Sequence, residues 1–331
     1  MATPLSKEWN SLSELIFVLR RDDFLTGSFE AEFRHPETGD SLGKSRMPPF
    51  LYRGEPAVYG STMGGLWRAQ SFLSHDDFEC IERLVISAVS AFAEKSREAL
   101  PFGEAVACAQ HYGFFTPLVD FSSSLYVSAH FAVGSAAAEK PSDELKYGTF
   151  MRVNLRRAQE HLELLRPTAL GGRFVRPSVQ QAWTIEPPAA VGNREGERIE
   201  DDYWRNLKSG FFSEAGIIET FHWQRNPKQD PLFFNPWLDC PPDDPYVGWP
   251  VLLVNQFVEE NGPLSDAVAT LLLGRLPLYH MVCFSADDTP ERDPNDGHVI
   301  APSELFCAGV HPGRVWDREF LRRNWTKTQS R

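Results

Sequence analysis

The chain has 331 residues, of which 42% are apolar and 24% are charged. This composition is typical of a folded globular protein, and it excludes a disordered chain, a collagen-like chain and a long coiled coil. The formal net charge is −12 at pH 7. Because nucleic-acid binding needs basic groups that displace counterions from phosphates, we do not expect the chain to bind DNA or RNA.

Aromatic residues and prolines are abundant, with 24 Phe, 9 Trp and 25 Pro in the chain. They predict a large aromatic core and several long, stiff loops. The first ten residues lack the apolar stretch of a secretion signal, and the apolar runs at 251–254 and 271–273 are too short to cross a bilayer. We therefore predict a cytoplasmic protein that does not enter a membrane.

The cysteines argue against a disulfide framework and against a zinc site. Their number is odd, and no two of them lie within four residues of each other. We expect free thiols in a reducing compartment and no bound metal. The five are Cys80, Cys108, Cys240, Cys283 and Cys307.

The first predicted element is a helix at 11–21, which begins with a Ser11 cap and carries Glu14 in its first turn. A polar connection at 24–43 and a strand at 50–53 follow. The clearest helix spans 76–100, where apolar residues recur at helical spacing between an acidic start and a basic end.

The remaining elements are shorter. Residues 226–250 contain seven prolines and no periodicity, so we predict an ordered loop held by Phe233, Phe234, Trp237 and Trp249. A polar loop is predicted at 187–202. Helices are predicted at 104–111, 125–138, 157–165, 264–273, 302–307 and 317–325. Strands are predicted at 116–121, 148–155 and 279–285, and a further strand or turn within 174–185.

Neither an internal repeat nor a linker between two cores is visible, so a single α+β domain is the simplest interpretation. It would consist of an N-terminal helix and connection at 1–45, a core at 46–186 and a loop-rich elaboration at 187–331 that completes the same domain. Several common catalytic motifs are absent. The sequence has no Gly-x-Ser-x-Gly elbow, and the loop at 60–65 lacks the Lys of a phosphate-binding Walker motif.

Three blocks of residues carry the functional signal. The first is Tyr52-Arg53-Gly54-Glu55, followed by Ser61-Thr62-Met63 and Leu66-Trp67-Arg68. The second is Gln110-His111-Tyr112-Gly113, then Thr116 to Ser122 (TPLVDFS), then Ala129-His130-Phe131-Ala132. The third is Arg176-Pro177-Ser178-Val179-Gln180-Gln181-Ala182.

These blocks resemble the FRG domain family, whose members carry an aromatic-Arg-Gly element, a Gln-His-x-Gly segment with a Thr-x-Leu-x-Asp-aromatic-Thr/Ser strand, and an Arg…Gln-x-Gly segment. The resemblance covers roughly residues 50–185 and is strongest in the second block. In the third block Ala182 stands where Gly is usual and Pro177 interrupts the pattern, and Leu125 replaces a customary Pro.

Arg53 at a strand end suits a clamp on phosphate or carboxylate, and alternatively it holds two strands together by pairing with Asp120. Asp120 follows an apolar strand, so it must be paired or lie at the mouth of a site. His111 suits a general base or a ribose contact, or else it braces the next turn. Tyr112 suits stacking on a planar ring, or else it belongs to the core.

Ser122 and Ser123 precede a helix, where they either cap it or offer donors to an anion. The chain also has a more distant resemblance to ADP-ribosyltransferases of the Arg–Ser–Glu type, in which an Arg, a Ser and a Glu follow one another along the chain around one NAD site. This resemblance implies that Arg53 binds the NAD pyrophosphate, that Ser122 braces the nicotinamide ribose, and that Gln181 takes the place of the catalytic Glu. Because Gln carries no negative charge, an acid elsewhere in the chain would have to supply the charge that the catalytic Glu provides. The candidates are Glu55, Asp120, Glu186, Glu214 and Glu219.

The resemblance implies an ADP-ribosyltransferase-like split sheet with flanking helices and long aromatic, Pro-rich loops. It implies NAD as the substrate, a macromolecular target and a bacterial toxin or defence effector; the alternative is a non-catalytic nucleotide- or protein-binding sensor. A purely structural Arg53–Asp120 pair is a third hypothesis, and oligomerisation is left open. The predicted catalytic set is Arg53, His111, Asp120 and Gln181, and the predicted nucleotide-binding set is Tyr52, Arg53, Gly54, Gln110, Tyr112, Ser122 and Ser123.

Overall fold

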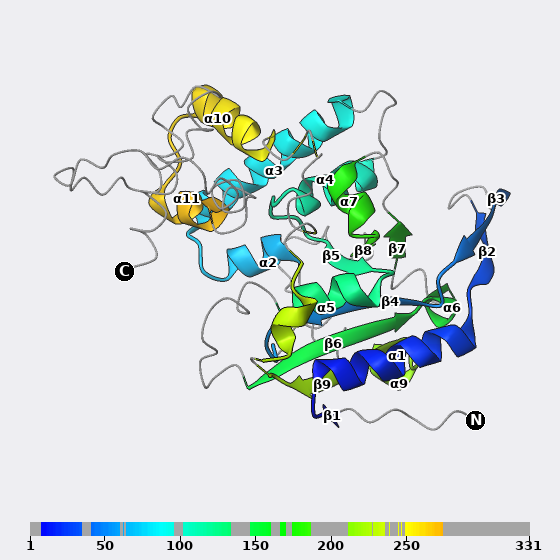
Figure 1. The fold of residues 1–331 in the computed structure, drawn as a ribbon. Coiled ribbons are helices and arrows are strands. Elements are labelled where there is room, and N and C mark those ends of the chain that lie inside the picture. The colour runs from blue at the N-terminus through cyan, green and yellow to red at the C-terminus, as the bar shows by residue number, and fades with distance from the viewer. Residues whose placement is uncertain are drawn as a thin grey trace. The chain divides into compact units, whose positions relative to one another are not determined.

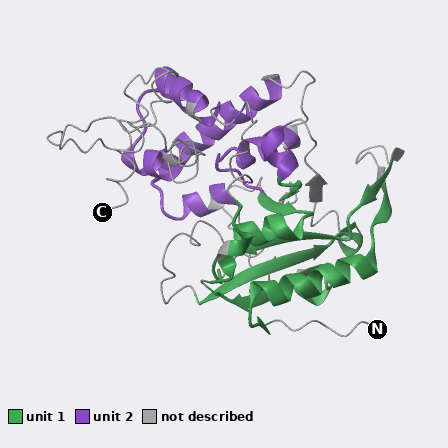
Figure 2. Ribbon diagram, in the orientation of Figure 1, with its two compact units in different colours: residues 1–63, 119–170, 180–235 green, residues 64–118, 171–179, 236–331 purple. Residues whose placement is uncertain are grey.

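A computed structural model describes two compact units, each built from three separate stretches of the chain (Figure 2). Unit 1 comprises residues 1–63, 119–170 and 180–235, and unit 2 comprises residues 64–118, 171–179 and 236–331. The described residues are 8–34, 41–59, 62, 64–95, 102–133, 146–159, 166–169, 174–186, 211–226, 228–235, 238, 244, 246 and 249–273.

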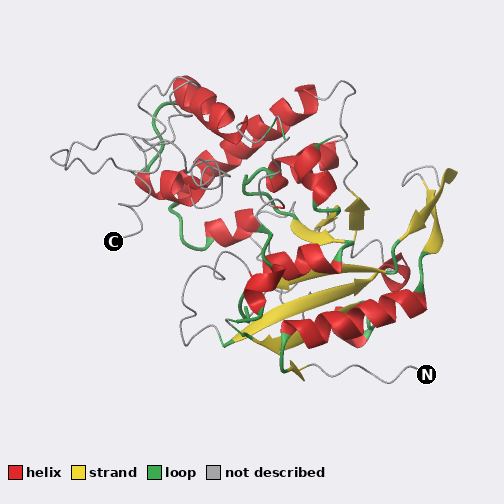
Figure 3. Ribbon diagram, in the orientation of Figure 1, coloured by secondary structure: helices red, strands yellow, loops and turns green. Residues whose placement is uncertain are grey.

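Within the described residues, unit 1 is built on a seven-stranded sheet with the order β1-β9-β6-β4-β5-β8-β7 (Figures 1 and 3). Neighbouring strands are antiparallel except for the parallel pair β1–β9. The strands are β1 (Glu8–Trp9), β4 (Phe50–Glu55), β5 (Val119–Ser122), β6 (Tyr147–Asn154), β7 (Arg166–Ala169), β8 (Ala182–Glu186) and β9 (Ile218–Gln224).

Two helices, α1 (Leu12–Thr26) and α5 (Leu125–Val133), pack on one face of this sheet. The cap of α1 is as predicted, because the Ser11 hydroxyl accepts a hydrogen bond from the Glu14 N–H at 3.2 Å. The core between helices and sheet is apolar and aromatic, with Leu15, Leu19, Phe150 and Trp223 among its most buried members. Short elements complete the unit: α6 (Leu155–Ala158), α9 (Phe211–Glu214) and the 3-10 turn η4 (Asp230–Phe233).

A two-stranded hairpin replaces the polar connection expected at 24–43, so that prediction is wrong. Strands β2 (Phe29–Arg34) and β3 (Ser41–Met47) pair with each other and extend away from the main sheet (Figure 1). Opposite charges face each other across the pair, Glu30 opposite Arg46 and Glu32 opposite Lys44. In β2 the charged residues alternate with the apolar residues Phe29, Ala31 and Phe33, which is the pattern of a strand with one polar face, and the sequence analysis overlooked it.

Unit 2 is helical in its described part. Its longest helix, α3 (His75–Lys95), buries the apolar stripe that predicted it, with Ile81, Leu84, Ala88 and Phe92 fully buried. The Ser74 hydroxyl caps its first turn by accepting from the Asp77 N–H at 3.2 Å. The other helices are α2 (Gly65–Gln70), α4 (Phe102–His111), α7 (Val175–Val179), α10 (Trp249–Asn261) and α11 (Asp266–Leu273).

The α+β class is confirmed, and so are the helices at the start of the chain and around 76–95, 104–111, 125–133 and 266–273. Phe233 and Phe234 pack on the core of unit 1 as expected. The sequence analysis missed β7, β9 and α10, and it placed the short helix after β6 too late. The elements predicted at 187–202, 279–285, 302–307 and 317–325, and Trp237, lie outside the described residues. The division at 46 and 186 stays a prediction.

Candidate functional site

Arg53 lies on β4, where the sheet of unit 1 begins to open. Strands β4 and β5 pair through one register position, Tyr52 opposite Ser122. Beyond it, the Nη1 of Arg53 donates a 3.0 Å hydrogen bond to the backbone carbonyl oxygen of Asp120. The guanidinium therefore adds a contact between β4 and β5 beside their one paired register position. Arg53 therefore joins two strands through the backbone of Asp120.

Glu55, one of the five candidate acids, lies two positions from Arg53 on the same strand and contacts it. The Nε of Arg53 donates to Glu55 Oε1 at 3.2 Å, and the Thr62 hydroxyl donates to the same oxygen at 2.8 Å. Glu55 is 3% exposed, whereas the Arg53 side chain is 18% exposed. Among the described residues no contact engages Nη2 of Arg53, so this nitrogen can bind an anion.

Tyr52 and Gly54 belong to the opposite face of β4, because neighbouring residues of a strand alternate between the two faces. Tyr52 is 1% exposed and its hydroxyl donates to an Asp23 carboxylate oxygen. A Cβ on Gly54 would lie 2.0 Å from the Ser128 carbonyl oxygen and 2.5 Å from Ala132 Cβ, both on α5. Both residues were predicted to bind a nucleotide; in the structure they pack against α1 and α5.

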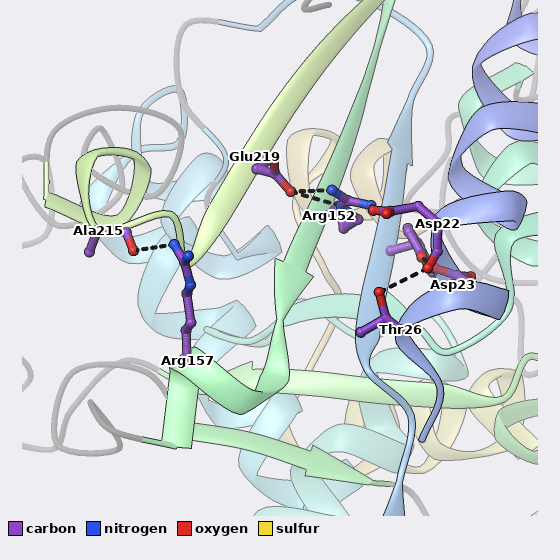
Figure 4. Close-up of polar contacts among 8 residues, drawn as sticks. Asp22, Asp23, Thr26, Arg152, Arg157, Ala215 and Glu219 are labelled. Atoms are coloured by element: carbon purple, nitrogen blue, oxygen red, sulfur yellow. Dashed lines mark hydrogen bonds and ion pairs between the residues drawn. The ribbon is translucent and has the colours of Figure 1, made fainter. Parts of the chain in front are cut away.

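A charged cluster that the sequence analysis missed ties α1 to the sheet (Figure 4). The Arg152 guanidinium on β6 pairs with Glu219 of β9 at 2.6 Å and with Asp22 of α1. Its centre also lies 4.3 Å from the Phe50 ring centroid. Glu219 was a candidate catalytic acid, and the structure places it in this ion pair.

Asp23 lies next to this cluster, and burial raises its pKa to about 6, although the Tyr52 hydrogen bond and the charge of Arg152 oppose that rise. The pKa of the Tyr52 hydroxyl is also raised, first by burial and then by the neighbouring Asp23 charge. The sequence signal for this charged cluster was weak. It consisted of two adjacent acids near the end of an amphipathic helix and one Arg in an apolar strand.

Ser122, Ser123 and Gln181 come together where β5 ends and β8 begins. The Ser122 hydroxyl donates to the Gln180 carbonyl oxygen at 2.7 Å and accepts from the Ser124 N–H at 3.0 Å. The Ser123 N–H donates to the Gln181 carbonyl oxygen at 3.1 Å, and its hydroxyl donates to Gln181 Oε1 at 3.3 Å. These bonds show that the second and third sequence blocks meet in space.

Gln181 itself is exposed and has a φ of 45°, a left-handed conformation that costs a non-glycine residue about 1 kcal/mol or more. Such strain persists where surrounding contacts fix it, and the two bonds to Ser123 do so here. Among the other candidate acids, Glu214 is exposed on α9 and Glu186 is the last residue of β8.

The remaining predicted residues belong to unit 2. Gln110 and His111 end α4, His111 is 6% exposed, and Gln110 Oε1 accepts from the Thr116 hydroxyl. Tyr112 is fully buried against Phe92, with ring centroids 5.3 Å apart, and its hydroxyl donates to Asp244 Oδ2 at 2.7 Å. Tyr112 therefore belongs to the aromatic core of its unit, the second of its two predicted roles.

Comparison with known protein families assigns the region that contains Arg53 and both Ser residues. Residues 48–141 match the model of the FRG domain, so this chain contains an FRG domain. The match begins before β4 and ends after α5, and it includes the first two sequence blocks; the third block lies beyond it. No curated protein and no solved structure matches the chain.

Two further features concern membranes and metal ions. Within the described residues no helix is long and apolar enough to cross a membrane. The same residues hold no group of three or more His, Cys, Asp or Glu side chains that could bind a metal ion. Arg53 is the one Arg of the predicted set, and its neighbour Glu55 also binds the Thr62 hydroxyl.

Proposed function

We propose that this FRG domain protein binds NAD or a related nucleotide at Arg53 and uses it as an ADP-ribosyltransferase-like effector on a macromolecular target. The supporting observation is the order of three neighbouring strands. Arg53 lies on β4, Ser122 lies on β5, and Gln181 immediately precedes β8, in the sheet order β4-β5-β8. The distant resemblance to ADP-ribosyltransferases places Arg, Ser and Glu in the same sequence order around NAD.

In this proposal Arg53 binds a phosphate oxygen of the nucleotide through its available Nη2. Glu55, already hydrogen-bonded to Arg53 and Thr62, supplies the negative charge that Gln181 lacks. Transfer would break the bond between the ribose and nicotinamide and form one from the same ribose carbon to a nucleophile of the target. Nicotinamide leaves with the bonding electron pair, and the nucleophile releases a proton. The carboxylate stabilises the positive charge that develops on the ribose.

Calorimetry with NAD and ADP-ribose tests the binding step. We expect binding to the wild type and to the control Arg157→Lys, which changes an exposed Arg that contacts the Ala215 carbonyl oxygen. Arg53→Lys should bind at least about tenfold more weakly, because Lys cannot reproduce the geometry of a guanidinium. Circular dichroism must show that both variants fold. Unchanged binding in Arg53→Lys, or no binding by the wild type, would reject the proposal.

A second function, nucleotide sensing without catalysis, is favoured by Gln181 at the position of the expected Glu. Nicotinamide release from NAD separates the two functions. Release by the wild type that falls at least about 100-fold in Glu55→Gln, with NAD binding retained, supports catalysis. Binding without any release supports the sensor.

A further inference from the structure

Arg176 in α7 is a cationic residue that neither the proposed reaction nor the core of unit 2 uses. Its Nε and Nη1 atoms are buried and have no hydrogen-bond partner among the described residues. The residue as a whole is only partly buried. Buried Arg groups normally have paired donors, because an unpaired buried charge costs several kcal/mol in a protein interior.

Asp244, the acid of unit 2 that binds Tyr112, is already bound by other groups. Asp244 is 6% exposed; its Oδ2 accepts from the Tyr112 hydroxyl at 2.7 Å and its Oδ1 accepts from the Tyr246 N–H at 2.9 Å. The pKa of Tyr112 is raised by burial and by Asp244, while the backbone N–H and the charge of Arg176 act against that rise. Arg176 thus lies near Tyr112 without pairing with the carboxylate that Tyr112 binds.

The surroundings are apolar and rigid. Phe174, two residues before Arg176, meets Tyr112 edge to face at 6.1 Å, Phe92 at 5.6 Å and Tyr246 at 5.0 Å between ring centroids. Trp249 closes the cluster against Phe92 at 5.4 Å. In such low-polarity surroundings a guanidinium attracts an anion more strongly than it would in water, and fixed rings keep the guanidinium in place.

We propose that unit 2 binds an oxyanion, a phosphate or carboxylate group of a small ligand, at the guanidinium of Arg176. The oxygen atoms of the anion accept from Nε and Nη1, the two donors that the protein leaves unbound. This site belongs to a different unit from Arg53, so it does not depend on the function proposed for unit 1. It also gives a role to the Arg of the third sequence block.

Thermal unfolding of the full chain with added oxyanions tests the proposal. Inorganic phosphate, pyrophosphate and succinate are titrated separately at constant ionic strength, so that phosphate and carboxylate ligands are distinguished. We expect a saturable rise in Tm for at least one of them. The rise should persist in Arg83→Met, which changes an exposed Arg of α3, and in Arg53→Lys.

In the Arg53→Lys background, which weakens the phosphate contact proposed for unit 1, Arg176→Met should lose the response. Its Tm without oxyanion should not be lower than that of Arg53→Lys alone, because an unpaired charge has been removed. If this variant does not fold, Arg176→Lys gives the same test, with at least a tenfold loss of oxyanion affinity expected. The proposal is overturned if none of the three oxyanions gives a saturable response, or if the Arg176 variants respond as the wild type does. A response lost in Arg53→Lys but kept in Arg176→Lys would place the anion in unit 1 and also overturn it.

Discussion

On β4, residues alternate between the two faces of the strand, and the two faces have different roles. Arg53 and Glu55 lie on one face and form the polar group from which we derive nucleotide binding. Tyr52 and Gly54 lie on the other face and hold α1 and α5 against the sheet. The four consecutive residues therefore combine a candidate binding group with a packing contact, and they respond differently to substitution.

Asp23 gives a pH-dependent prediction at this scale. Its pKa of about 6 in the folded protein exceeds the unfolded value of 3.8, so the folded state holds a proton that the unfolded state releases earlier. This contribution to stability is present below about pH 4 and is lost as the pH rises through about 6. Asp23→Asn keeps an oxygen acceptor for Tyr52 and cannot ionise.

We therefore expect Asp23→Asn to be more stable than the wild type at about pH 8, by about 1 kcal/mol after allowance for partial exposure, and nearly equal to it at about pH 4. Urea unfolding at both pH values measures the difference. Asp76→Asn, on the exposed side of α3, is the control and should show no such change with pH. A difference for Asp23→Asn that is the same at both pH values would contradict the assignment.

At the scale of elements, the contact between β4 and α5 depends on the missing side chain of Gly54. An added Cβ would lie 2.0 Å from the Ser128 carbonyl oxygen and 2.6 Å from the Ala132 backbone nitrogen, and neither backbone atom can move without displacing the helix. The aromatic-Arg-Gly element thus has a packing reason for its Gly: α5 approaches the strand too closely for any other residue.

Gly54→Ala should lower the free energy of unfolding by about 1–3 kcal/mol, the usual cost of overpacking a core, and should not raise it as alanine does at unstrained sites. Chemical denaturation measures the change. Ser90→Ala, at an exposed position of α3, serves as the control and should stay within about 0.5 kcal/mol of the wild type. A neutral or stabilising Gly54→Ala would show that α5 does not pack on β4 this closely.

Elements with a clear apolar period were predictable, and elements without one were not. The buried stripe of α3 and the capped start of α1 follow from spacing and local hydrogen bonds alone. The β2–β3 hairpin is an exception: β2 alternates apolar and charged residues, but its partner β3 is mostly polar and shows no such alternation, and the pair was missed. In β9, exposed and partly buried polar residues interrupt the apolar ones, which leaves only the Phe221–Trp223 alternation as a signal.

At the scale of the whole molecule, the net charge of −12 argues against general nucleic-acid binding. Labelled duplex DNA and single-stranded RNA should show no saturable change in fluorescence anisotropy with this protein at about 150 mM salt. The same assay with a basic DNA-binding protein verifies that the labelled strands are competent. Saturable binding that weakens steeply with salt would contradict this prediction and would point to a local basic surface.

The sequence by itself determined the α+β class, most of the longer helices and the FRG domain, because these depend on composition, periodicity and short motifs. It also singled out Arg53 and named Glu55 among the acids to consider. It could not determine which acid lies beside Arg53, since five carboxylates were equally compatible with the spacing.

The tertiary structure decided which side chains contact each other. Arg152 joins α1 to β6 and β9, Thr62 and Arg53 share Glu55, and Tyr112 binds Asp244, a residue 132 positions away. It also placed Tyr52 and Gly54 against α1 and α5, and it left Nε and Nη1 of Arg176 buried without a partner among the described residues. Such contacts join residues far apart in the chain. Periodicity tells only whether a side chain is buried, whereas the packing of elements fixes what it is buried against.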